Sequence, residues 1–214
     1  MEEQIMNMPA VALRGLTILP GMIAHFDISR ERSLRAVEEA MEQDQKIYLV
    51  TQRNVDSEDP TQEDLYQMGI VADIKQVVRL QNDVVRILVD GISRAALLGF
   101  TDNEKYLEAE ICYCDSNADS LPEDLREAML LGVREAFHRY AAVVGKISKE
   151  LIRQIDQYED LEKLIDYVTN NLPVSYELKQ QVLEAEDIND RYQVIVSLLL
   201  SQVEVISIKN ELQK

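Results

Sequence analysis

The spacing of the apolar residues changes once along this chain, and that change constrains the fold more than any other feature. Up to about Asp115, apolar and β-branched residues form short runs or alternate with polar ones, which is typical of strands. Beyond Pro122 they recur every three or four residues, as on one face of a helix. A chain of 214 residues is long enough for two cores. We therefore predict an α+β protein with a β-rich domain over 1–116 and a helical domain over 117–214.

The strongest strand pattern spans residues 69–100. Its β-branched runs are interrupted at Gln81-Asn82-Asp83 and again at Asp90-Gly91. Because Asn and Asp tolerate positive φ, the first interruption predicts a tight hairpin. Further predicted elements are strands at 46–52 and 106–115, a strand over 11–19 with a bend at Gly15, a helix over 28–43 with Ser29 as its N-cap, and a surface loop with a helical turn at 54–66. These elements suggest a small, closed or strongly curved β domain.

Helical segments fill the second half of the chain. Ser120 and Glu123 around Pro122 predict a capping box. Later segments predict amphipathic helices, each of them opened by a Ser or an acid: 148–158, 159–171 and 175–185. Residues 203–208 alternate like a strand, but the helical spacing from Ile188 onward predicts one long helix to the end. No Gly cap or Pro stops this helix, as in a chain that ends inside an element.

Charge and hydropathy exclude several classes of protein. The formal net charge of −17 disfavours binding to a phosphate backbone, so we expect no nucleic-acid partner. Two acids, Glu2 and Glu3, stand where a secretory signal would carry basic residues. The longest strongly apolar run, 194–200, is shorter than the roughly 18 residues of a membrane span. We therefore expect a cytoplasmic protein without a membrane partner.

Residues that carry chemistry are sparse. Cys112 and Cys114 are the only cysteines and have no further ligand nearby in the sequence, so we predict thiols and no metal site. His25 lacks a neighbouring nucleophile or paired acid, and Gly145-Lys146 lacks the remainder of a phosphate-binding loop. We predict no catalytic residue and no cofactor in these residues.

An apolar turn is the candidate binding feature. Pro20 and Gly21 predict a turn, yet Met22 and Ile23 follow at once where polar residues are usual. Exposed apolar patches often mark interaction sites, and the flexible methionine thioether adapts to varied partners. Two alternatives stay open: Met22 and Ile23 form a binding patch together with Pro20 and Gly21, or they begin a strand and pack inward.

Three separated motifs resemble the N-terminal region of Lon, the ATP-dependent serine protease. Residues 8–41 are similar to its opening, in which Leu-Arg precedes a proline by several residues and a further Arg precedes an amphipathic helix; the matching positions are Arg14, Leu19, Pro20, Gly21 and Arg30. Residues 85–100 match a second motif at Val89, Gly91 and Arg94. Residues 171–213 match the helical segment that leads to the ATPase module. One departure is Asp83, where the family often has Gly in the hairpin.

The resemblance implies a PUA-like β domain followed by a helical bundle that ends in a long helix. It also implies a role in ATP-dependent protein degradation and quality control: recognition of unfolded or damaged proteins and support of the Lon hexamer. ATP and Mg²⁺, and the Ser-Lys protease site, belong to domains absent from these residues, so we expect a non-catalytic part of a longer enzyme.

Two other functions are considered. The first is a stand-alone PUA-like protein that binds a small ligand or peptide without protease activity; a phosphate-binding loop encoded downstream would exclude it. The second is RNA binding by analogy of fold, which the net charge of −17 opposes. Repulsion between acidic copies also leads us to expect a monomer or weak dimer of this region.

Overall fold

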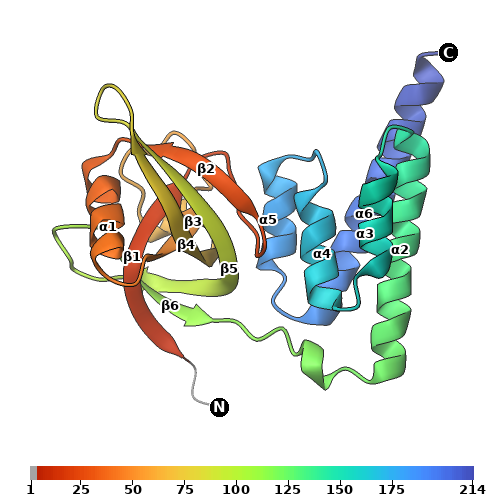
Figure 1. Ribbon diagram of the computed structural model, residues 1–214, viewed down its shortest axis with the longest axis horizontal. Helices are drawn as coiled ribbons and strands as arrows, with labels where there is room; N and C mark the ends of the chain where they lie inside the picture. The colour runs from red at the N-terminus through yellow and green to blue at the C-terminus, as the bar shows by residue number, and fades with distance from the viewer. Residues whose placement is uncertain (1–3) are drawn as a thin grey trace. The chain divides into compact units, whose positions relative to one another are not determined.

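A computed structural model describes residues 4–214 (Figure 1). Its internal contacts divide the chain into two compact units, one that ends at Cys114 and one that comprises Asp115–Lys214. Glu2 and Glu3, on which the expectation against a secretory signal rests, lie outside the described residues.

The first unit is a β barrel with one α-helix. Its elements are β1 (Ile5–Leu13), β2 (Ile23–Ile28), α1 (Glu31–Glu42), β3 (Lys46–Thr51), the 3-10 turn η1 (Gln62–Asp64), β4 (Met68–Arg79), β5 (Val85–Phe100) and β6 (Glu108–Tyr113). The six-stranded sheet has the order β2-β5-β4-β3-β1-β6, and β5 also pairs with β6. This last pairing closes a ring of β5, β4, β3, β1 and β6, which confirms the predicted closed β architecture.

The long strand β5 makes the closure possible. Along one edge it pairs with β4, while the other edge pairs with β2 over its first half and with β6 over its second half. The register with β4 shifts between Val71 and Ala72, opposite Gly91 and Ser93. The predicted interruption at Asp90-Gly91 is therefore a bulge within one strand, because an extra residue bends a strand without ending it.

The hairpin between β4 and β5 is confirmed. Asn82 and Asp83 have φ values of 61° and 59°, and the N–H of Val84 donates to the carbonyl of Gln81 at 3.4 Å. Positive φ at both central residues is the pattern of a type I′ turn, which Asp83 adopts without a glycine.

Two local predictions in this unit are wrong. The N-cap of α1 is Arg30 and not Ser29, and no side chain caps the helix. The strand predicted through Leu19 ends at Leu13, because the chain turns at Gly15, whose φ is 66°. Ile18 and Leu19 are still buried, so their apolar character serves the core without a strand.

Successive residues of β1 pack into two different clusters of the core. Val11 and Leu13 join a cluster that includes residues of α1, whereas Ala10 and Ala12 join a cluster with Tyr48. This alternation is what the period of two in a strand produces when both faces are covered.

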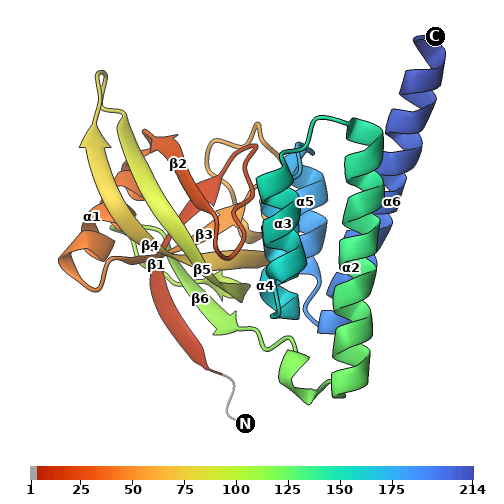
Figure 2. The same cartoon turned by 45° about the vertical axis from the view of Figure 1, so that its right-hand side comes forward.

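The second unit is helical. Its elements are η2 (Ala118–Ser120), α2 (Glu123–Val144), α3 (Lys149–Gln157), α4 (Leu161–Asn170), α5 (Tyr176–Glu184) and α6 (Ile188–Leu212). The long helices α2 and α6 pack side by side (Figures 1 and 2). The predicted long terminal helix is confirmed, and Ser148 and Asp160 cap α3 and α4. The predicted capping box is absent: Pro122 is the N-cap of α2, and no side chain caps it.

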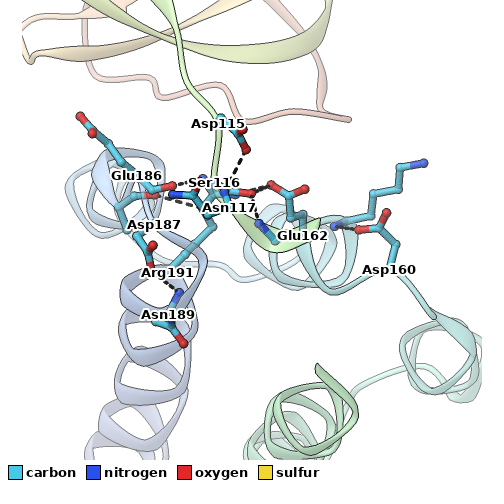
Figure 3. A network of polar contacts seen from close by, with 12 residues as sticks. Asp115, Ser116, Asn117, Asp160, Glu162, Glu186, Asp187, Asn189 and Arg191 are labelled. Carbon is cyan, nitrogen blue, oxygen red and sulfur yellow. Dashed lines mark hydrogen bonds and ion pairs between the residues drawn. The ribbon is translucent and has the colours of Figure 1, made fainter. Parts of the chain in front are cut away.

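A buried arginine ties this unit together. Arg191 is 2% exposed and donates to the Glu162 carboxylate at 3.2 Å and to the carbonyls of Ala185 and Glu186 at 3.1 Å each (Figure 3). Ser116 also donates to Glu162, and its own carbonyl accepts from the N–H of Ile188 at 2.8 Å. The network joins the segment before α2 to the starts of α4 and α6. Such charge-assisted bonds fix the register of the packed helices.

Helix α6 is, among the described helices, the one long and apolar enough to cross a membrane by length and composition. The same pattern occurs in core helices, and Ile188, Ile195 and Leu199 of α6 are buried. Packing within the helical unit accounts for the buried apolar residues of its first half, but only 17% of the apolar stretch is buried, and Val205 and Ile208 in the second half are 56% and 58% exposed.

Candidate functional site

The apolar turn contains one hydrogen bond of its own and forms two more with β5. Gly21 has a φ of 78°, and the N–H of Met22 donates to the carbonyl of Leu19 at 3.1 Å. Gly21 donates to the carbonyl of Gly91, and Gly91 donates back to the carbonyl of Met22, both at 2.9 Å. Two glycines thus lie at this contact. Gly21 adopts a positive φ, and Gly91, without a side chain, allows the turn to approach β5 closely.

The four candidate residues differ in their exposure to solvent. Ile23 is 69% exposed, and Gly21 is also exposed. Met22 is partly buried and packs against the core cluster that contains α1, and Pro20 is partly buried. Of the three apolar side chains in the proposed patch, only that of Ile23 is largely exposed, which makes Ile23 the better probe of binding.

Strand β2 continues from the turn with one exposed face. Ile23, His25 and Asp27 are exposed, whereas Ala24 and Phe26 pack against the core. His25 lines a shallow hollow of about 260 Å³ with Gln76, Val78, Arg86 and Leu88. The exposed face of β2 therefore carries the apolar side chain of Ile23, the imidazole of His25 and the carboxylate of Asp27.

Asp27 forms a two-pronged ion pair across the strands. Its carboxylate accepts from Nε of Arg86 at 2.8 Å and from Nη2 at 3.1 Å. The bonds to Arg86 hold the pKa of Asp27 below its ordinary value and raise the pKa of Arg86. Because both side chains are exposed, the pair fixes local geometry more than it stabilises the fold.

A second hollow, of about 250 Å³, lies beside the end of β2. Its lining combines apolar side chains with two guanidinium groups, one carboxylate and one hydroxyl: Ala12, Leu13, Arg14, Leu16, Phe26, Asp27, Ile28, Ser29 and Arg30. Arg30 donates to the carbonyls of Ala12 and Glu58 and to the side chain of Gln52, at 2.8, 3.3 and 3.2 Å. Arg14 donates to the carbonyl of Ser57 at 3.0 Å. Burial and then the charge of Arg14 lower the pKa of Arg30.

Arg14 and Arg30 place two positive charges beside this hollow. Within residues 4–214 neither forms an ion pair with a carboxylate, although Asp59 lies close enough to oppose the lowering of the Arg30 pKa. Sequence reasoning placed both arginines in a motif but missed that they share a hollow. The available signal was that each arginine follows the end of a strand closely, Arg14 by one residue after Leu13 and Arg30 by two residues after Ile28.

The remaining titratable residues in the described part of the chain do not form a cluster that could hold a metal ion. No such group of three or more His, Cys, Asp or Glu occurs there. Cys112 and Cys114 are partly buried free thiols, and the Cys114 sulfur lies 3.6 Å from the Met68 sulfur. His138, in the helical unit, contacts Asp156 at 2.7 Å and lies on an exposed surface.

Comparison with known proteins identifies the family. A family model described as the ATP-dependent protease La (LON) substrate-binding domain matches residues 7–201. The chain is 36% identical over 213 residues to the Lon protease of Lachnoclostridium phytofermentans, covering 100% of this chain and 26% of that protein. It is 34% identical over 209 residues to the Lon protease of Clostridioides difficile, covering 96% and 27%. The chain thus spans about a quarter of the length of these curated relatives.

A solved structure agrees in fold. The N-terminal domain of Mycobacterium avium complex Lon protease matches with a TM-score of 0.73 at 18% identity, over 91% of this chain and 98% of that one. Together with the family model, this similarity confirms the resemblance in the three sequence motifs. The chain belongs to the Lon substrate-binding domain family.

Proposed function

We propose that this chain is the substrate-engaging region of an ATP-dependent Lon protease in the cytoplasm. In this role it binds unfolded or damaged proteins and helps to organise the hexamer that degrades them. ATP and Mg²⁺ act in the ATPase module of the longer enzyme. The observation that carries the proposal is the match of a substrate-binding domain model to nearly the whole chain.

The exposed turn supports the proposal physically. Ile23 is 69% exposed at the start of β2, next to a turn held rigidly by Gly91. An apolar side chain on a rigid support can bury area against an incoming chain at little entropic cost to the protein. A contact of this kind is weak and does not depend on a particular sequence. It therefore suits substrates that have exposed apolar residues in common but differ in sequence.

A titration with an unfolded protein tests this function. The chain is mixed with a fluorescently labelled, permanently unfolded polypeptide, and anisotropy gives the affinity of the wild type, of Ile23→Ser and of Leu98→Ser. Leu98 is 41% exposed on β5 and provides a matched control outside the turn. We expect Ile23→Ser alone to weaken binding, by about fivefold for the loss of roughly 1 kcal/mol of apolar burial. No binding by the wild type would refute the proposed function.

A further inference from the structure

We propose that the free edge of β2 receives an extended segment of an unfolded polypeptide as an added strand. The inference rests on the proposed function and specifies how the substrate is held. It concerns the backbone of Ile23–Ile28, whereas the apolar patch concerns the side chains of Pro20, Met22 and Ile23 at and beside the preceding turn.

The edge of β2 is open. In the described part of the chain, β2 pairs with β5 alone, whereas each strand of the closed ring has a neighbour on both sides. Figure 2 shows β2 beside β5 along the first half of that strand. Six residues of strand present about 20 Å of edge, enough for an added strand of similar length.

The direction of the free backbone groups follows from the register. The carbonyl of Met22 accepts from Gly91 and so points toward β5, while the N–H of Met22 bonds within the turn to Leu19. Backbone groups alternate in an antiparallel pair, so those of Ala24 and Phe26 also point to β5. The N–H and C=O groups of Ile23, His25 and Asp27 consequently point toward the open edge. A chain that lies along this edge can bond to all three residues.

The edge lacks the usual protection against such pairing. Native edge strands are blunted by Lys, Pro, bulges or inward charges. The sequence of β2, IAHFDI, contains no Lys or Pro, its one acidic side chain, Asp27, is paired with Arg86, and its register with β5 is uninterrupted from Ile23 to Ile28. An edge left available in this way is suited to binding by strand addition, in which backbone bonds give affinity without requiring a particular sequence.

Charge favours a substrate segment over a second copy of this chain. Two copies that each carry a net charge of −17 repel when their edges approach. The hollow beside the end of β2 instead presents Arg14 and Arg30, which attract a carboxylate of an incoming segment, and the Asp27 carboxylate that also lines the hollow is paired with Arg86. Its apolar lining from Leu16 and Phe26 leaves room for a neighbouring apolar side chain. We therefore assign the edge to an unfolded polypeptide segment of mixed apolar and acidic character.

The test uses backbone chemistry in the partner. Ten-residue peptides of one apolar-acidic sequence that binds the chain are N-methylated singly at each central amide, and affinities are measured by calorimetry. Strand addition predicts that methylation at every second amide weakens binding about tenfold or more, because those N–H groups face β2, while the intervening positions are tolerated. These tolerated peptides are the matched controls. If the affinity does not alternate with the position of the N-methyl group, the proposal that β2 binds the segment as an added strand is wrong.

A substitution in the chain gives an independent check. His25→Pro removes one donor that faces the open edge and no donor that faces β5, a position at which edge strands tolerate proline. We expect a folded variant with weaker binding of the unmodified peptide; unchanged affinity would contradict strand addition. If the variant does not fold, the peptide series on the wild type decides. Pairing of β2 between two copies, seen as a dimer in sedimentation that the peptide does not dissociate, would also overturn the proposal.

The two proposals fail in different ways. If Ile23→Ser weakens binding of the unfolded protein but the methylation profile is flat, the proposed function stands and the β2 edge is excluded. If no unfolded polypeptide or peptide binds the wild type, both fail together.

Discussion

A β-carbon placed on Gly91 would lie 2.4 Å from the carbonyl oxygen of Leu19, closer than side-chain atoms approach a backbone oxygen. Gly91→Ala should therefore displace the Leu19–Met22 turn and lower the free energy of unfolding by about 1–3 kcal/mol. Gly99→Ala on the same strand is the control, because its β-carbon would meet its nearest atom at 3.7 Å. Urea denaturation of both variants checks the difference, and equal stabilities would contradict the close packing of the turn on β5.

The exposure of Ile23 and the burial of Met22 predict opposite effects. Ile23→Ser should change the free energy of unfolding by less than about 0.5 kcal/mol, since the side chain is 69% exposed. Met22→Ser should cost about 1–2 kcal/mol, because Met22 packs against the core. Thermal or urea unfolding of the two single variants measures both. A larger loss for Ile23→Ser than for Met22→Ser would reverse the assignment of the two side chains.

The pair of Asp27 and Arg86 predicts a pH dependence at the acidic end. The bonds from Arg86 lower the pKa of Asp27, so the pair's stabilisation is complete above the ordinary Asp pKa of about 3.9 and is lost as the pH falls through the lowered value. An NMR titration of the Asp27 carboxyl carbon should give a pKa below the ordinary value in the wild type and near it in Arg86→Gln. The same pKa in both proteins would show that Arg86 does not hold the carboxylate.

The burial of Arg191 predicts a large loss on its removal. Arg191→Met leaves the acceptors of Ala185 and Glu186 without their donor and should cost about 3 kcal/mol. Arg153→Met removes an ion pair with Glu150 whose side chains are 64% and 57% exposed, and should cost less than about 0.5 kcal/mol. Denaturation followed by helical circular dichroism compares them. A tolerated Arg191→Met would mean that packing alone holds the helical unit.

The left-handed conformation of Asp83 predicts that glycine improves the hairpin. Asp83→Gly should stabilise the chain by a few tenths of a kcal/mol up to about 1 kcal/mol, because its φ of 59° is free of strain only for glycine. Asp83→Ala should destabilise it by about 1 kcal/mol, since alanine lacks a polar side chain that bonds locally. The order Gly, Asp, Ala in melting temperature is the expected result; any order with Ala above Asp would exclude the type I′ turn.

The repeating patterns predicted most elements of this fold well, because the buried residues of a strand or helix recur at the period of that element. The alternation around Gln81-Asn82-Asp83 gave the hairpin, and the spacing from Ile188 to Ile206 gave the long helix although residues 203–208 alternate like a strand. Helix ends were predicted less well. Ser29 and Ser120 are good capping residues, but the chain leaves Arg30 and Pro122 at the N-cap positions because the tertiary path fixes where each helix starts.

The site was only partly accessible to sequence reasoning. The turn at Pro20 and Gly21 was predicted from residue types alone, but the inward packing of Met22 depends on contacts with residues distant in the chain. The open edge of β2 follows from the order of the strands, which no local pattern specifies. The shared hollow of Arg14 and Arg30 likewise arises only when the ends of two strands meet.

The most direct test of substrate engagement is an NMR titration of the ¹⁵N-labelled chain with an unlabelled, permanently unfolded polypeptide. We expect saturable shifts of the backbone amides from Ile23 to Ile28, with those of Ile23, His25 and Asp27 changing most. Shifts confined to other surfaces, or none at polypeptide concentrations near 1 mM where even weak complexes form, would contradict this expectation.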